Sequence, residues 1–193
     1  TDVVNLGYTH GYLTLGLSAW LLFRRRNSFV VAKQPVLCWL MPALLTTSLL
    51  WLLTYRASIE IGYELLLPAI LWIAVWGVFG RPAARAGAFP IGYMYFAIPI
   101  WDYLMGPLQF LTVMAVGVIL RVLGVPLHIE GNLVSIPEGR FEIAGGCGGL
   151  HFFIVALALG ALIGELRLDP WRRRLQLLLV AAVFALLANW IRV

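Results

Sequence analysis

Charged residues are scarce in this chain: only 12% of its 193 residues are Asp, Glu, Lys or Arg, whereas 62% are hydrophobic and the mean hydropathy is +0.91. Soluble globular domains carry about 25% charged residues. Apolar runs recur instead, at about the 18 to 20 residues that a helix needs to cross the hydrocarbon core of a membrane. The shortage of charge therefore excludes a soluble domain and predicts an all-α polytopic membrane protein.

Cysteine is also rare. The two cysteines, Cys38 and Cys147, lie in very different surroundings, and neither forms a Cys-x-x-Cys or Cys/His pair with the spacing of metal ligands. A disulfide framework is not supported, and no metal or other cofactor is expected. Cys38 falls near the cytoplasmic end of a predicted span, and we interpret it as filler.

Acidic residues are outnumbered: 9 Asp and Glu stand against 14 Lys and Arg, which gives a net charge of +5. The excess comes from arginine clusters at the ends of apolar runs, in Arg24–Arg26, Gly80–Arg85 and Arg167–Arg174. Such clusters are typical of the cytoplasmic ends of membrane spans. The positive charge therefore indicates which ends of the spans face the cytoplasm. The expected surroundings are membrane lipid, and no nucleic-acid partner is expected.

The apolar runs and basic turns together predict about six transmembrane helices and one interfacial or re-entrant helix. The predicted spans cover residues 5–23, 36–54, 64–79, 87–104, 148–166 and 175–193. Residues 86–124 join an inner turn to an outer one, so they must cross an odd number of times, and their length allows one crossing. We therefore expect 107–124 to lie tilted or re-entrant at the outer surface.

The pattern changes over residues 125–143, where short β-like pieces are separated by turn residues such as Gly131 and Asn132. This alternation predicts a small extracytoplasmic β-hairpin or meander. Its strand edge could pair with an extended peptide or simply connect two helices.

We expect residues 1–193 to form a single integral membrane domain that is truncated at both ends. No Met begins the chain, and Val193 ends it abruptly beside an apolar run. Later spans are expected to follow.

One stretch, residues 141–153, places a thiol inside four glycines: F-E-I-A-G-G-C-G-G-L-H-F-F. If Cys147 lies in the first turn of the helix that follows, unpaired backbone N–H groups and the helix dipole favour its thiolate. The glycines would let another chain's backbone approach the sulfur. The alternative is that the small residues serve helix packing and that the thiol is inert.

The last predicted span brings two polar residues, Asn189 and Arg192, to the outer end of the membrane. They are three residues apart and so share one helix face. Arginine at an outer end is costly unless it faces water or a partner. Arg192 reaches the same depth as Cys147, where its guanidinium would favour the thiolate and could bind an oxyanion.

Asn189 and three further residues are candidates for acid/base or substrate contact. His10 is predicted near the outer surface, where an interfacial histidine is the alternative. Asp102 near the outer end of its span is either a pocket carboxylate or an interfacial residue. His151 follows Cys147 by four residues, so that on a continuous helix it would share the same face and could reach the sulfur.

Several blocks of this sequence resemble the exosortase/archaeosortase family of membrane cysteine transpeptidases. The blocks are Y-T-H-G-Y-L and W-L-L-F-R-R-R near the start, P-L-Q-F-L-T and L-G-V-P-L-H-I-E-G-N-L-V-S-I-P in the middle, and F-E-I-A-G-G-C-G-G-L and A-N-W-I-R-V toward the end. They cover nearly the whole chain in the order and spacing of that family.

The resemblance implies that Cys147 is a nucleophile and Arg192 the arginine of a Cys/Arg/His set. It implies protein substrates with a C-terminal sorting tail, made of a short Pro-Glu-Pro type motif, a transmembrane helix and a basic end. The enzyme would sit in the bacterial inner membrane, cleave at the periplasmic face, hold the product as a thioester and pass it to an acceptor.

This chain departs from the family pattern at two points. The family usually has Ser after the cysteine, where this chain has Gly148. The family's histidine lies on a later span, so we expect the acid/base beyond Val193, with His151 as the candidate within the chain.

The alternative interpretation is a membrane protein without enzymatic activity, such as a transporter or assembly factor in exopolysaccharide export. Cys147 would then be a packing residue. Hydrolysis and transpeptidation differ only in what attacks the thioester, and the sequence leaves both open.

Overall fold

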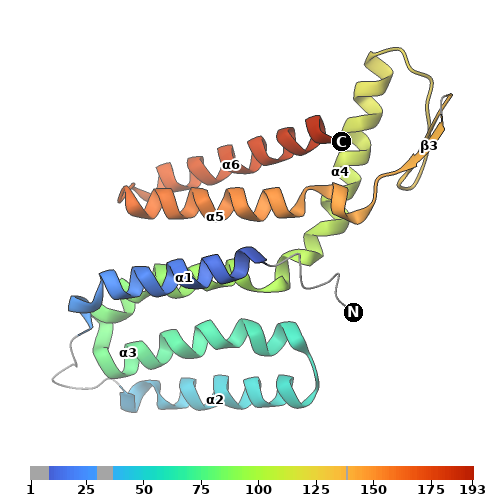
Figure 1. Ribbon diagram of the computed structural model, residues 1–193. Coiled ribbons are helices and arrows are strands. Elements are labelled where there is room, and N and C mark those ends of the chain that lie inside the picture. Colours follow the sequence, from blue (N-terminus) through green and yellow to red (C-terminus); the bar gives the residue numbers. More distant parts are fainter. Residues whose placement is uncertain (1–8, 30–36, 138) are drawn as a thin grey trace. The chain divides into compact units, whose positions relative to one another are not determined.

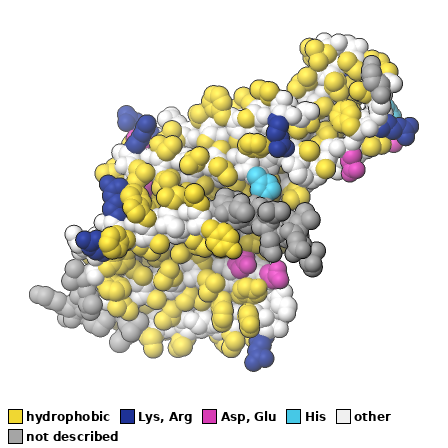
Figure 2. Space-filling view, viewed as in Figure 1, with side chains coloured by type: hydrophobic (Ala, Val, Ile, Leu, Met, Phe, Trp, Pro, Cys, Tyr) yellow, Lys and Arg dark blue, Asp and Glu magenta, His cyan; other side chains and the backbone are white. Residues whose placement is uncertain are grey.

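The computed structural model describes residues 9–29, 37–137 and 139–193. The chain separates into two compact units, Thr1–Pro99 and Ile100–Val193, which are described in turn. Most described residues are helical (Figure 1), and hydrophobic side chains dominate the visible face (Figure 2). An abundance of exposed apolar side chains on helices is what a lipid surrounding requires. The prediction of one integral membrane domain stays a prediction.

The first unit is entirely helical in its described part. Its elements are α1 (Thr9–Arg24), the 3-10 turn η1 (Arg26–Ser28), α2 (Leu37–Arg56), α3 (Glu60–Tyr93) and the 3-10 turn η2 (Met94–Ala97). Helices α2 and α3 form a hairpin. Near its turn, Tyr55 of α2 makes an edge contact with Tyr63 of α3, and Trp51 stacks on Tyr55 within α2. Aromatic residues of this kind favour the ends of membrane spans.

Helix α3 folds back on itself at Gly80, whose φ of +80° and ψ of −177° are not helical. Two hydrogen bonds demonstrate the reversal: Trp72 Nε1 donates to the Ala84 carbonyl at 2.9 Å, and the Tyr95 hydroxyl donates to the Leu65 carbonyl at 3.1 Å. Thirty residues of straight helix would span about 45 Å. The two antiparallel arms agree with a predicted span over 64–79 that ends in a basic turn at Gly80.

Among the described residues, four helical stretches are long and apolar enough to cross a membrane. They are Glu60–Ala97, Pro99–Val122, Gly145–Leu166 and Trp171–Arg192. The first contains the reversal at Gly80. The chain is therefore a multi-pass membrane protein, while the count of six spans stays a prediction.

The predicted span over 87–104 is wrong as a continuous α-helix. The α-helix ends at Tyr93, η2 follows, and Ile98 is extended before the 3-10 helix η3 (Pro99–Leu104). Proline disfavours a helical conformation in the residue before it and has no N–H to continue the ladder, which explains the break at Ile98.

The second unit contains α4 (Met105–Val122), a small sheet, and two helices that lie side by side in opposite directions. These are α5 (Leu150–Leu166) and α6 (Trp171–Arg192); α4 runs at a steep angle to both (Figure 1). Gly160 of α5 lets α5 and α6 pack closely, because a Cβ at this position would already touch the Cβ of Ala181 in α6 at 3.4 Å. Whether 107–124 lies tilted or re-entrant stays a prediction.

The sheet is a three-stranded antiparallel meander, which confirms the predicted hairpin or meander over 125–143. Its strands are β1 (His128–Glu130), β2 (Leu133–Ile136) and β3 (Gly139–Glu142), in the order β1-β2-β3. Gly131 in the first turn has a φ of +60°, which glycine adopts without strain.

The sheet packs on α4 through a small core of Val113, Val116, Val134 and Ile143. Val134 is completely buried. A Cβ on Gly117 would lie 2.8 Å from Ile129 Cδ1, so this glycine lets the sheet approach the helix closely. The chain thus leaves β3 at a fixed position beside α4.

The turn between α5 and α6 is held by a buried ion pair. Arg174 Nη1 donates to the carboxylate of Glu165, which is only 6% exposed, and Arg174 Nε donates to the Asp169 carbonyl at 2.7 Å. A buried carboxylate is costly when its partner is removed.

We predict that Arg174→Ala destabilises this helical hairpin because it leaves Glu165 without its guanidinium. The expected loss is about 2 kcal/mol, below the full value for a buried pair because the Arg174 side chain is 35% exposed. Thermal unfolding of the purified protein measures it. Arg173→Ala is the matched control, since Arg173 is 3.9 Å from Asp169 and its side chain is 71% exposed. Equal unfolding temperatures for the two variants would contradict the prediction.

Candidate active site

Cys147 lies in a short turn that connects the sheet to α5. The 3-10 helix η4 (Gly145–Gly148) contains it, and its N–H donates to the Ala144 carbonyl at 2.8 Å. Gly149 follows with a φ of +79°, and α5 starts only at Leu150. The prediction that Cys147 occupies the first turn of this helix is therefore wrong, because a left-handed glycine breaks the helix after it.

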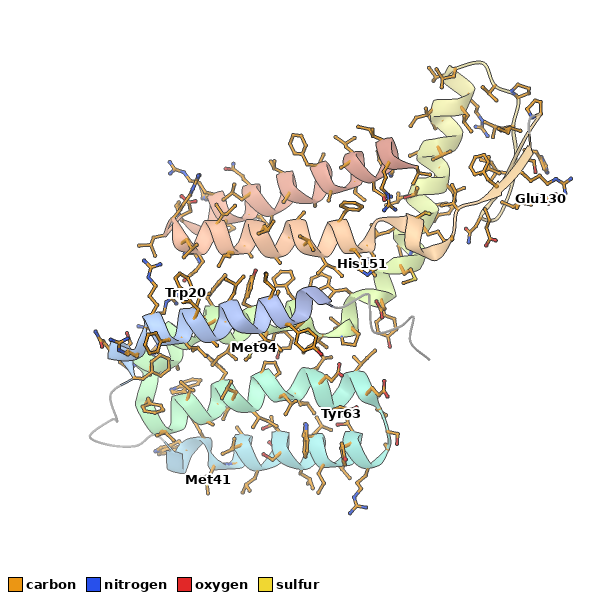
Figure 3. All side chains as sticks on the ribbon, viewed as in Figure 1. Trp20, Met41, Tyr63, Met94, Glu130 and His151 are labelled. Atoms are coloured by element: carbon orange, nitrogen blue, oxygen red, sulfur yellow. The ribbon has the colours of Figure 1, made fainter. Side chains whose placement is uncertain are left out.

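The same break separates Cys147 from His151. The spacing of four residues puts two side chains on one face only within a continuous helix. Here His151 belongs to the first turn of α5 (Figure 3) and is exposed, whereas Cys147 precedes Gly149. Cys147 and His151 therefore do not share a helix face. The acid/base role of His151 stays a prediction.

Asn189 holds the turn in place from α6. It is completely buried, and its Nδ2 donates to the Cys147 carbonyl at 2.9 Å and to Thr112 Oγ1 of α4 at 3.3 Å. Its Oδ1 is buried with no partner among the described residues. The side chain that the sequence marked as a possible acid/base or substrate contact therefore ties the thiol-bearing turn to two helices.

Gly149 is required by this arrangement for two reasons. A side chain at its positive φ is strained, and a Cβ would lie 2.5 Å from Asn189 Cγ. Gly146, on the other side of Cys147, meets nothing within 4 Å. The glycines thus have different roles, one for packing and one that leaves open space beside the thiol.

Gln109 of α4 is a positioning residue that sequence reasoning did not assign to the site. Its Nε2 donates to the Ile143 carbonyl at 2.5 Å, where the chain leaves the sheet. A Cβ on Gly148 would lie 3.1 Å from the Gln109 backbone nitrogen, so the turn passes against the helix backbone. The available signal was an amide in an apolar helix, where polar groups pair with neighbouring segments.

Arg192 lies beside the thiol-bearing turn. Its Nη2 donates to the Gly146 carbonyl at 3.4 Å, and its Cζ is 5.0 Å from the centre of the Phe152 ring. A guanidinium over an aromatic face is attracted by the ring. The structure thus places Arg192 next to the residue that precedes Cys147, at the same end of α5 and α6.

The Cys147 thiol is reduced and partly buried, and its side chain packs against the small core between the sheet and α4. Within the described part of the chain, no group of three or more His, Cys, Asp and Glu residues could hold a metal ion. The arrangement offers a nucleophile, a guanidinium and a turn fixed by two amides. These are the components of nucleophilic attack on a carbonyl with stabilisation of the oxyanion.

The two other candidates belong to other elements. Asp102 is an exposed residue of η3, at the start of the second unit. His10 belongs to α1 of the first unit, and its side chain lies outside the described residues. Their roles stay predictions.

Comparison with known proteins gives one family. The family model described as Transmembrane exosortase (Exosortase_EpsH) matches residues 3–193 of this chain. No curated protein and no solved structure matches it.

We predict that Gly149→Ala loosens the turn around Cys147. The positive φ and the contact with Asn189 should together cost about 1 to 3 kcal/mol, and the thiol should react faster with a polar maleimide. Thermal unfolding and the rate of maleimide labelling measure the two effects. Gly146→Ala is the control, since its Cβ would meet open space. Identical stability and labelling in the two variants would contradict this description of the turn.

Proposed function

Since the chain belongs to the transmembrane exosortase family, we propose that it is a cysteine-type protease or transpeptidase of the bacterial inner membrane. It cleaves the C-terminal sorting tail of exported proteins at the periplasmic face. The observation that carries the proposal is the position of the Arg192 guanidinium, 3.4 Å from the carbonyl of Gly146 and thus at the residue beside Cys147.

Cys147 acts as the nucleophile in this mechanism. Its thiolate attacks the carbonyl carbon of the scissile peptide bond, and the electron pair of that carbonyl moves to the oxygen. When the tetrahedral intermediate collapses, the C–N bond breaks, the amine of the tail takes up a proton and a thioester remains on Cys147. Water or an acceptor nucleophile then attacks the thioester and restores the thiolate.

Arg192 stabilises the negative charge in this mechanism. Its planar guanidinium presents several N–H donors, and the one that now bonds the Gly146 carbonyl at the long distance of 3.4 Å can turn to an oxyanion at little cost. Phe152 under the guanidinium limits its movement. Arg192 at the protein surface also remains accessible to an entering peptide.

The departing amine requires a proton donor. His151 at the start of α5 is one candidate, and the family resemblance implies a histidine on another span instead. The two assignments differ in the effect of His151→Gln, which abolishes cleavage in the first case and leaves it in the second.

The proposed substrate matches the topology of the chain. A sorting tail with a transmembrane helix and a basic end has its scissile motif just outside the membrane. The basic turn at Arg167–Arg174 is predicted to be cytoplasmic, so the opposite end of α5 and α6, which carries Cys147 and Arg192, faces outward.

We predict that Cys147→Ala abolishes processing of a tail-bearing substrate and that Arg192→Lys lowers its rate by roughly 10²-fold. Removal of a nucleophile typically costs 10³-fold or more, while lysine keeps the charge of arginine but loses its planar set of donors. Co-expression of each variant with a reporter that ends in a sorting tail, followed by separation of the two reporter sizes, measures the rate. Membrane fractionation confirms insertion.

Cys38→Ala is the matched control, because it removes the chain's other thiol and should leave processing unchanged. A trapped covalent adduct between the reporter and the Arg192→Lys enzyme, sensitive to hydroxylamine, would support the thioester. Normal processing by Cys147→Ala would reject the proposal and favour a transport or assembly role in which the thiol only packs.

A further inference from the structure

The first unit contains a cavity of about 430 Å³ whose lining includes none of the residues of the proposed chemistry. Side chains from α1, the first arm of α3 and η2 line it, together with Ile98. Its lining residues are Leu15, Glu64, Leu67, Pro68, Leu71, Met94, Ala97 and Ile98. Leu15, Leu67 and Leu71 are each between 39% and 51% exposed, so the cavity opens at the surface of the unit.

Glu64 is the only ionisable residue in this apolar lining. Its Oε2 atom is buried and has no hydrogen-bond partner among the described residues. A carboxylate inside a membrane span raises the free energy of the folded protein unless a partner or a ligand replaces the hydrogen bonds that water would make. No Lys or Arg lines the cavity, so the described part of this chain supplies no counter-charge there.

Pro68 lies four residues after Glu64, is buried and lines the cavity. Its ring adds to the apolar wall and brings no polar side chain. The buried Oε2 atom of Glu64 is therefore the acceptor that a ligand in the cavity can use.

Glu60, one turn earlier on the same helix, adds further negative charge near this end. The end lies opposite the reversal at Gly80, which the basic turn predicts to be cytoplasmic. Glu64 is therefore expected toward the outer leaflet, at the level where lipid headgroups meet acyl chains.

We propose that this cavity binds a lipid with a primary ammonium headgroup. The ammonium has three donors and a positive charge, which match the buried acceptor and the charge of Glu64. An acyl chain fills the apolar part between Leu67, Leu71 and Met94 (Figure 3 marks Met94). Met94 adapts well to a flexible chain because its own side chain is flexible. A volume of about 430 Å³ lies within the range of ligand cavities.

The experiment uses the purified protein in phosphatidylcholine vesicles that contain a trace of photoactivatable lipid. The reactive diazirine sits in the acyl chain, and the headgroup is either ethanolamine or glycerol. Mass spectrometry of the irradiated protein locates labelled peptides. We expect the ethanolamine lipid to label peptides containing Leu67 to Leu71 and Met94 to Ile98, and unlabelled phosphatidylethanolamine to compete where phosphatidylglycerol does not.

Glu64→Gln should lower this labelling by about tenfold, since it keeps the shape of the side chain and removes its charge. Glu142→Gln is the matched control, because Glu142 is an exposed carboxylate of β3 that does not line the cavity. Leu71→Trp fills the apolar part and should also lower labelling while the charge stays. Thermal unfolding of each variant shows that it remains folded.

Equal labelling by the two headgroups, or no change in Glu64→Gln, would overturn the proposal. Labelling at these peptides that is blocked by another polypeptide rather than by phosphatidylethanolamine would also overturn it, because the occupant would then be a protein helix. None of these results depends on Cys147, so the outcome is independent of the proposed cleavage reaction.

Discussion

The hydrogen bond from the buried Asn189 amide to the Cys147 carbonyl, 2.9 Å long, is the contact on which the site depends. This one buried side chain joins α6 to the turn before α5. Its second hydrogen bond, to Thr112 Oγ1, joins both to α4. In a membrane the hydrophobic effect gives little force between helices, so close packing and such polar contacts set their arrangement. The turn is held from one side by Asn189 and from the other by Gln109, which leaves the thiol in a defined place.

This construction explains why the reactive turn is so rich in glycine. Gly149 adopts a left-handed conformation directly against Asn189, and Gly148 lies against the backbone of α4. Any side chain at these two positions would push the turn away from the amides that hold it. Gly146 has space around it, and the Arg192 guanidinium reaches its carbonyl. Packing and access are thus divided between neighbouring glycines.

Much of this organisation could be predicted from the residues. Apolar run length and arginine clusters identify the helices, and the turn pair Gly131-Asn132 indicates the meander. The ends of α5 and α6 follow from counting spans between basic turns. That argument is what places Arg192 and Asn189 near Cys147.

Other features depend on contacts between distant segments, which no local pattern carries. The left-handed Gly149 is fixed by Asn189, forty residues later, so helix periodicity alone placed Cys147 and His151 on one continuous helix. Gln109 and Glu64 are polar residues in largely apolar helices, and only the fold shows that Gln109 holds a turn and that Glu64 lines a cavity. The break in the helix at Ile98 is hard to predict from composition, because the apolar residues continue on both sides of it.

The reversal at Gly80 has a consequence for how its two arms can move. The chain changes direction at one residue, and the Trp72 indole is bonded to the Ala84 carbonyl just beyond it. With no loop between the arms to absorb a displacement, a tilt of the first arm carries the start of the second arm with it.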